Sequence, residues 1–139
     1  MTSRYEGGCV CGAVRYACTA EPVATVNCHC RDCQKTSGSP YISGLVVPAE
    51  AFESTGAVTW YGTTADSGRR SERAFCPTCG SSLFGRPESG GLLFVHATTL
   101  DDPSWFKPAM DIYTASAQPW DVMDPALAKF EAMPQMDPA

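Results

Sequence analysis

Cysteines are the residues of this 139-residue chain whose type and spacing could do chemistry, and seven of the eight fall into short motifs. The motifs are Cys-x-Cys at residues 9–11, Cys-x-Cys-x-x-Cys at residues 28–33 and Cys-x-x-Cys at residues 76–79. Such cysteines form disulfides in oxidising compartments and bind metal ions in reducing ones. The first residues lack the apolar core of a signal peptide, so we expect a cytoplasmic protein whose cysteines bind metal.

The first and third motifs predict one closed metal site. In each, a glycine, Gly12 or Gly80, directly follows the second cysteine. A metal-binding turn bends tightly around the sulfurs, often through positive φ, and its backbone N–H groups face the thiolates. A redox pair is the alternative for the third motif, but such pairs begin a helix, and here a strand pattern follows. We therefore expect a tetrahedral structural Zn²⁺ with the ligands Cys9, Cys11, Cys76 and Cys79.

The middle motif predicts an open site. Cys28, Cys30 and Cys33 can surround one ion and leave a coordination position free, as in catalytic zinc sites. His29 is a candidate fourth ligand, although its place between two ligands would strain the coordination. The remaining cysteine, Cys18, alternates with apolar strand residues and suits the core.

A site made of three thiolates favours a sulfur ligand. Three thiolates on Zn²⁺ leave a net negative charge, which weakens the metal as a Lewis acid, and soft sulfur ligands attract another sulfur. The metal also lowers the pKa of a bound thiol. The pattern therefore indicates chemistry on a small thiol rather than peptide hydrolysis. His96, within a strand pattern, is interpreted as a strand residue and not as a ligand.

The elements that must position these motifs are mostly β-strands. β-Branched and aromatic residues gather in short runs separated by Gly, Pro, Ser and Asp. The sequence predicts an antiparallel, mainly β domain with strands at residues 14–20, 41–47, 57–63, 82–86, 92–100 and 110–116. Helices are predicted over residues 31–38, ending at Gly38, and after Asp124 and Pro125.

Composition limits the function classes. The chain is 44% hydrophobic and 18% charged, which suits a single domain over residues 1–139. Its net charge of −5 argues against a nucleic-acid partner, and no apolar run approaches the roughly 18 residues of a membrane span. A basic cluster of Arg69, Arg70 and Arg73 is typical of a solvated loop. The composition leaves a homo-oligomer open.

The motifs resemble the glutathione-dependent formaldehyde-activating enzyme family, which includes centromere protein V. The resemblance covers nearly the whole chain, with the three cysteine motifs in order. It is carried by GGCVCGAVRY (7–16), NCHCRDCQKTSGSPY (27–41), RAFCPTCGSSLF (73–84), TLDDP (99–103) and, more loosely, PAMDIYTASAQPW (108–120) and the following FE.

This resemblance implies small antiparallel sheets in a β-tent arrangement around a structural zinc shared by the first and third motifs. It also implies a catalytic zinc on the middle motif. The implied activity is that of a carbon–sulfur lyase joining formaldehyde to glutathione as S-hydroxymethylglutathione. One departure is Asp111 in the run MDIY, where family members often carry a histidine. Asp111 weakens the transfer of the family's substrate to this chain.

Several polar residues are candidates for binding the substrate. Arg69, Arg70 or Arg73 could pair with substrate carboxylates, since arginine makes bidentate contacts, although Arg73 could equally be a structural partner of the zinc turn. Ser37, Ser39 and Tyr41 could line the pocket or be ordinary loop residues. Two rivals to the enzyme are a non-catalytic zinc-binding thiol carrier or protein-interaction module, and a second zinc that is closed and purely structural.

Overall fold

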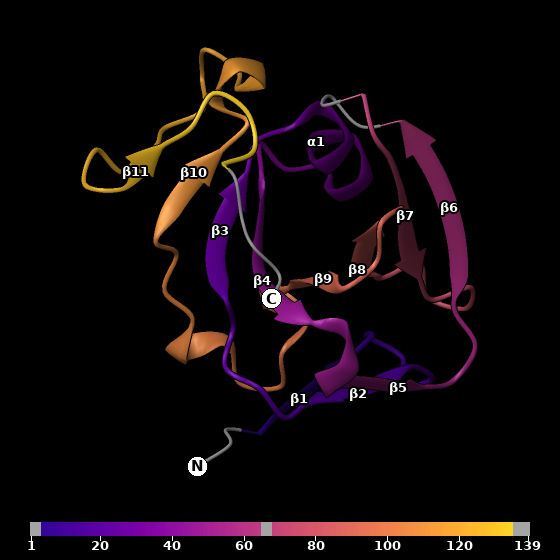
Figure 1. The fold of residues 1–139 in the computed structure, drawn as a ribbon. Helices are drawn as coiled ribbons and strands as arrows, with labels where there is room; N and C mark the ends of the chain where they lie inside the picture. The colour runs from indigo at the N-terminus through magenta and orange to yellow at the C-terminus, as the bar shows by residue number, and fades with distance from the viewer. Residues whose placement is uncertain (1–3, 65–67, 135–139) are drawn as a thin grey trace.

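The computed structural model describes residues 4–64 and 68–134, which form a mainly β fold with one α-helix, α1 (Arg31–Ser37) (Figure 1). Eleven strands pair into a three-stranded sheet of order β1-β2-β5 and an eight-stranded sheet of order β11-β10-β3-β4-β9-β8-β7-β6. The strands are β1 (Tyr5–Gly8), β2 (Arg15–Cys18), β3 (Ala24–Cys28), β4 (Ile42–Pro48), β5 (Phe52–Thr55), β6 (Thr59–Thr64), β7 (Arg70–Phe75), β8 (Ser82–Pro87), β9 (Leu92–His96), β10 (Met110–Ile112) and β11 (Ala128–Lys129). The predicted mainly β class is confirmed.

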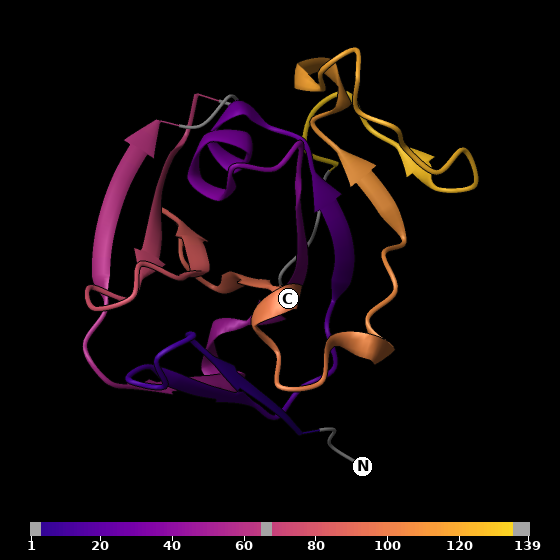
Figure 2. The ribbon, with the colours of Figure 1, turned by 180° about the vertical axis from the view of Figure 1, so that it is seen from behind.

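The larger sheet curls around an interior, and the two cysteine regions lie at its opposite ends. Figure 1 shows α1 at one end of the curled sheet and the small β1-β2-β5 sheet at the other. Strand β3 runs towards α1, whereas β7 runs towards the small sheet, and the reverse view in Figure 2 shows the same arrangement. The middle cysteine motif is therefore separated from the other two.

Strand pairing is antiparallel except at β10. This strand pairs in parallel with both β3 and β11, so that Asp111 lies opposite Asn27 and Ile112 opposite Cys28. The expectation of antiparallel sheets is thus corrected at one edge. The parallel pair joins strands far apart in sequence, which local strand patterns do not reveal.

Each end of the molecule has its own apolar core. The first core lies on one face of the larger sheet, where side chains alternate between the two faces. It includes Leu45, Val47 and Val95, which pack in one cluster with Cys9 and Cys76. The second cluster contains the three middle cysteines. Its other buried members are Val26, Ile42 and Ile112.

The predicted strands are confirmed in part. The runs at 14–20, 41–47, 57–63 and 82–86 correspond to β2, β4, β6 and β8, and the ends of these strands lie within two residues of the expected ends. The runs at 92–100 and 110–116 are shorter strands, because 3₁₀ turns at Ala97–Thr99 and Thr114–Ser116 interrupt them. Strands β1, β3, β5, β7 and β11 were not predicted.

The predicted helix over residues 31–38 is confirmed. Helix α1 covers Arg31–Ser37 and ends at Gly38, whose φ of 71° lies in the left-handed region that glycine adopts readily. Among the described residues, no helix is long and apolar enough to cross a membrane.

The second predicted helix, after Asp124 and Pro125, is wrong. The side chain of Asp124 accepts a hydrogen bond from the backbone N–H of Ala126 at 2.8 Å. This hydrogen bond closes a turn and does not begin a helix. The chain then enters β11, in which Ala128 pairs with Met110. Tertiary pairing overrides the local helical preference here.

Candidate metal centres

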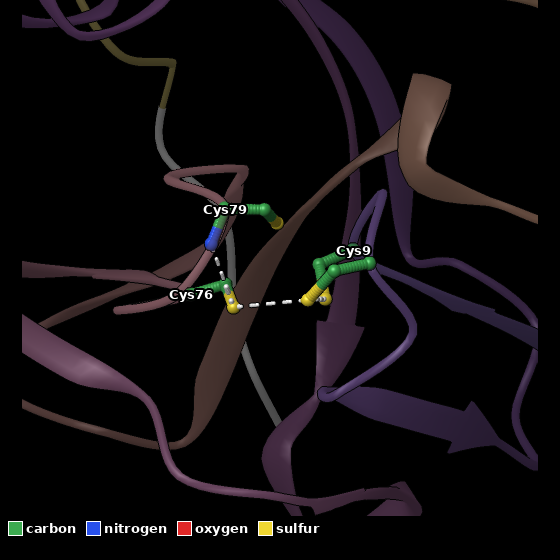
Figure 3. Close-up of side chains that lie close together, drawn as sticks. Cys9, Cys76 and Cys79 are labelled. Atoms are coloured by element: carbon green, nitrogen blue, oxygen red, sulfur yellow. Dashed lines mark hydrogen bonds between the residues drawn. The ribbon is translucent and has the colours of Figure 1, made fainter.

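Four cysteine sulfurs from distant segments converge at the end of the molecule near β1. The Sγ atoms of Cys9, Cys11, Cys76 and Cys79 all lie within 4.8 Å of one another. Figure 3 shows Cys9 on one turn, and Cys76 and Cys79 on a second turn that faces it. Cys11 Sγ lies 3.6 Å from that of Cys9 and 3.8 Å from that of Cys76. A tetrahedral zinc with Zn–S bonds of about 2.3 Å would separate its sulfurs by about 3.8 Å, so the cluster fits this ion.

Backbone N–H groups point at the sulfurs, as the sequence predicted. The N–H groups of Thr78 and Cys79 face Cys76 Sγ at 3.4 and 3.5 Å, and that of Val14 faces Cys9 Sγ at 3.3 Å. Gly80 has a φ of 78° and Gly12 a φ of 81°, so each turn closes through the left-handed region. These dipoles partly offset the negative charge of the thiolates.

Ser81 contacts the first cluster, and the sequence analysis did not single it out. Its hydroxyl lies 3.2 Å from Cys79 Sγ and accepts a hydrogen bond from the N–H of Val10 at 3.1 Å. The side-chain hydrogen bond from Ser81 is the main cause that lowers the pKa of Cys79 to about 5. Ser81 thus joins the two turns and favours a thiolate at the exposed ligand.

The three middle cysteines form a second, buried cluster where β3 ends and α1 begins. The Sγ atoms of Cys28, Cys30 and Cys33 all lie within 4.8 Å of one another, and the described residues bring no fourth Cys, His, Asp or Glu into this group. The residues are 6%, 4% and 2% exposed, respectively. Cys30 is also the N-cap of α1, since its Sγ accepts from the N–H of Cys33 at 3.3 Å. The helix start therefore aims all three sulfurs at one point.

Hydrogen bonding among the three middle thiols shifts their pKa values in opposite directions. The side-chain hydrogen bond between Cys28 and Cys30 lowers the pKa of Cys30 and raises that of Cys28 well above its ordinary value. A metal ion that takes all three as thiolates must release protons, so binding there should weaken in acid.

Arg73 projects from β7 to the middle cluster. Its Nη2 donates to Cys33 Sγ at 3.6 Å and to Cys30 Sγ at 3.9 Å. The prediction that Arg73 lies in a solvated loop is wrong, because the residue is half-buried within β7. The proposal that Arg73 supports the zinc turn of the third motif is also corrected, because its sulfur contacts are with the middle motif.

His29 is not placed to coordinate the ion. Its Nε2 lies 2.8 Å from Asp111 Oδ1 and its Nδ1 lies 2.5 Å from Asp121 Oδ2, so both ring nitrogens have carboxylate partners. The alternative of His29 as a fourth ligand is therefore contradicted in this structure. Asp111, the departure from the family pattern, is one of its two partners.

The other candidates occupy varied places. Cys18 is fully buried in the core and His96 is buried in β9, as predicted. His96 Nδ1 lies 3.1 Å from the carbonyl oxygen of Ser82, whereas its buried Nε2 and Arg73 Nε have no hydrogen-bond partner among the described residues.

The predicted pocket residues Ser37, Ser39 and Tyr41 surround the end of α1. Ser37 Oγ donates to the carbonyl of Cys33 at 2.7 Å, and Ser39 Oγ accepts from the N–H of Tyr41 at 3.4 Å. The ring of Tyr41 lies 5.0 Å from that of His29. Arg69 and Arg70 are exposed where β7 begins. Substrate binding by these residues stays a prediction.

The fold and the two clusters define a small β protein whose cysteines could hold metal ions at two separate centres. A family model described as glutathione-dependent formaldehyde-activating enzyme matches residues 4–116, so the chain belongs to this family. The resemblance seen in the sequence is thereby confirmed.

Curated relatives carry related names. A Penicillium rubens protein named "Putative glutathione-dependent formaldehyde-activating enzyme" is 32% identical over 93% of this chain and 74% of its own length. A Talaromyces marneffei protein of the same name is 32% identical over 76% of this chain and 60% of its own. A Schizosaccharomyces pombe protein named an uncharacterized lyase is 28% identical over 58% of this chain and 56% of its own.

A crystal structure of a Rhodobacter sphaeroides protein is similar to this fold, with a TM-score of 0.53 and 21% identity. The match covers 69% of this chain and 87% of that one. At this identity the likeness concerns the fold alone.

Proposed function

We propose that this protein is a zinc-dependent carbon–sulfur lyase acting on a glutathione-type thiol adduct. The reaction joins formaldehyde to the thiol as S-hydroxymethylglutathione, or splits that or a related adduct. Family membership and the names of the relatives support the thiol and the carbonyl partner. A cytoplasmic location agrees with this role, because thiolate ligands persist in a reducing compartment.

One observation carries the proposal: three buried sulfurs converge on a point to which the described residues bring no fourth Cys, His, Asp or Glu ligand atom. A zinc ion held there by Cys28, Cys30 and Cys33 would have a position free for a thiol. His29, the nearest histidine, is occupied by two carboxylates. The other cluster supplies four sulfurs, which suits a closed structural zinc.

Zinc, when bound at the middle motif, supplies a site that holds a thiol in its thiolate form. The charge there is balanced by the protein. Three thiolates exceed the charge of Zn²⁺ by one, and the guanidinium of Arg73 contacts two of the sulfurs and offsets this excess. Arg73 thereby lessens the repulsion that an incoming thiolate meets.

The chemical step needs no redox partner. The substrate sulfur adds to the carbonyl carbon, the carbon–oxygen π pair moves to oxygen, and the oxygen takes up the proton that the thiol lost. Cleavage is the reverse. Binding both partners in one site contributes through proximity. Within this proposal Arg69, with Arg73, Ser37 and Tyr41, contacts the glutathione part, where arginine can pair with a carboxylate.

The test is turnover of S-hydroxymethylglutathione by zinc-loaded protein, followed in both directions against the uncatalysed rate. We expect acceleration by the wild type and none by Cys30→Ser, which removes a ligand of the middle motif. Zinc counts and thermal unfolding would verify that this variant keeps its fold and the other metal. A wild-type rate equal to the uncatalysed one, with glutathione still bound, would instead indicate a thiol carrier.

A further inference from the structure

His29 lies between two proposed metal ligands, and each of its polar groups has a partner. Its N–H donates to the carbonyl of Ile112 at 3.0 Å, and its carbonyl accepts from Gln34 Nε2 at 2.7 Å. Its ring nitrogens face Asp111 Oδ1 at 2.8 Å and Asp121 Oδ2 at 2.5 Å. The residue is therefore fixed at the backbone and at both sides of the ring.

The ring partners form a buried hydrogen-bonded network. The side chains of His29, Asp111 and Asp121 are 0%, 1% and 1% exposed, respectively. Lys129 Nζ donates to Asp111 Oδ2 at 2.8 Å, so the network extends to β11. Buried polar side chains persist in proteins when they are hydrogen-bonded in this way.

The partners come from a distant part of the chain. Asp111 lies in β10, whose parallel pairing with β3 sets Ile112 opposite Cys28. Asp121 follows ten residues later. Gln34 of α1 also donates to the carbonyl of Ser116 at 3.0 Å and accepts from Gln118 Nε2 at 3.0 Å. The 111–121 segment thus contacts the middle motif from both the strand and the helix side.

We propose that His29, held by Asp111 and Asp121, is a positioning residue that fixes Cys28 and Cys30 in the arrangement a metal ion requires. The inference rests on the proposed metal site of the middle motif and adds to it. Ligands already held in place lose less conformational freedom when the ion binds, and their sulfurs keep one geometry. The network contacts the loop at the residue between two ligands, where a small rotation would move both sulfurs.

The first cluster provides an internal reference. Its buried cysteines, Cys9 and Cys76, pack in a different apolar core from the cysteines of the middle motif, at the other end of the molecule. A substitution that acts only through positioning should affect the middle motif and spare the first cluster. A substitution that destabilises the whole fold should weaken metal binding at both.

The experiment exchanges the zinc of folded, zinc-loaded protein for Co²⁺, with a chromophoric chelator as competitor, and follows the thiolate charge-transfer and d–d bands. The band lost in Cys30→Ser identifies the middle motif. The variants are His29→Gln, Asp121→Ala and Asp111→Ala, with Asp111→Asn as a conservative variant that retains an oxygen acceptor. Asp101→Asn is the matched control, since Asp101 pairs with Arg15 outside this network.

We expect the first three variants to weaken Co²⁺ binding at the middle motif by about 10- to 100-fold, the range for residues that orient metal ligands. The d–d bands of that site should shift at saturation, and Asp111→Asn should lose less affinity than Asp111→Ala. The first cluster and the Asp101→Asn protein should bind as wild type. Unchanged affinity and spectrum at the middle motif, or equal weakening at both centres, would overturn the inference. No readout uses a substrate thiol, so the result is independent of turnover.

Discussion

At the scale of single residues, Arg73 shows how one side chain can adjust a metal site without binding the ion. Its guanidinium contacts the sulfurs of Cys30 and Cys33 at 3.9 and 3.6 Å. Charge-assisted hydrogen bonds contribute about 1.5–3 kcal/mol each. Removing the guanidinium should therefore weaken the binding of any further anion at the site.

We expect Arg73→Met, which is uncharged and of similar length, to weaken glutathione binding to zinc-loaded protein by about 10- to 100-fold, as that energy implies. Calorimetric titration measures the effect. Arg73→Lys should lie between the two, because it keeps the charge but not the planar fork. An Arg73→Met protein that binds glutathione like the wild type would refute a charge-balancing role.

His96 should make stability depend on pH. Burial is the main cause that lowers its pKa from 6.5 to about 4. Between these values the unfolded chain binds a proton that the folded protein does not. Stability therefore falls as pH drops from 6.5 towards 4, and this contribution stays constant below that range. The full difference corresponds to about 3 kcal/mol.

The measurement is urea unfolding from pH 7.5 to pH 5, comparing wild type with His96→Asn, whose amide can still donate to Ser82. We expect the variant to lose less stability on acidification. Both proteins share the acid sensitivity of the cysteine sites, so the comparison cancels it. Parallel pH profiles would contradict a neutral, buried His96.

At the scale of elements, the turns decide where sulfurs point. Gly80 has a φ of 78°, its N–H donates to the carbonyl of Cys76 at 2.8 Å, and a Cβ there would meet open space. Gly80→Ala should therefore cost about 1–2 kcal/mol through backbone strain alone. It should also speed zinc release from the first cluster, because the strained turn carries two of its ligands.

Gly90→Ala is a matched control for this change. Gly90 has a φ of 71° and similar open space, but it lies in a turn without cysteines. Both variants should show similar losses in urea unfolding, whereas only Gly80→Ala should release zinc faster to a chelator. Equal rates of zinc release from the two variants would mean that Gly80 is needed for the backbone turn alone and not for holding the metal ligands.

Helices and strands were predicted correctly from the sequence only where local signals decided them. The helix ending at Gly38 was predicted correctly, because its signals lie within one stretch of chain. The helix after Asp124 was wrong, because pairing of Ala128 with Met110 decided the outcome. Several strands were missed for a similar reason: β7 carries the charged run Arg70 to Arg73 and is stabilised by its neighbours on both sides.

At the scale of the whole molecule, the two centres should differ in what they support. The first cluster connects the β1–β2 turn with the β7–β8 turn, and a structural zinc there would stabilise the fold by up to about 10 kcal/mol. Cys79→Ser should lower the melting temperature sharply and remove one zinc. Cys30→Ser should lose the other zinc and keep the fold. Similar unfolding of both variants would refute this division.

The sequence by itself determined the family and the grouping of the cysteines into two clusters, because cysteine spacing and the glycines that follow are local features that chemistry constrains tightly. Apart from the pairing of the first and third motifs, which residues come together across the chain was decided only by the tertiary structure. The sequence could not show that Arg73 reaches the middle motif, that Ser81 joins the two turns, or that Asp111 and Asp121 hold His29. These contacts depend on the curl of the sheet and on the parallel pairing of β3 with β10, which join residues that no local pattern relates.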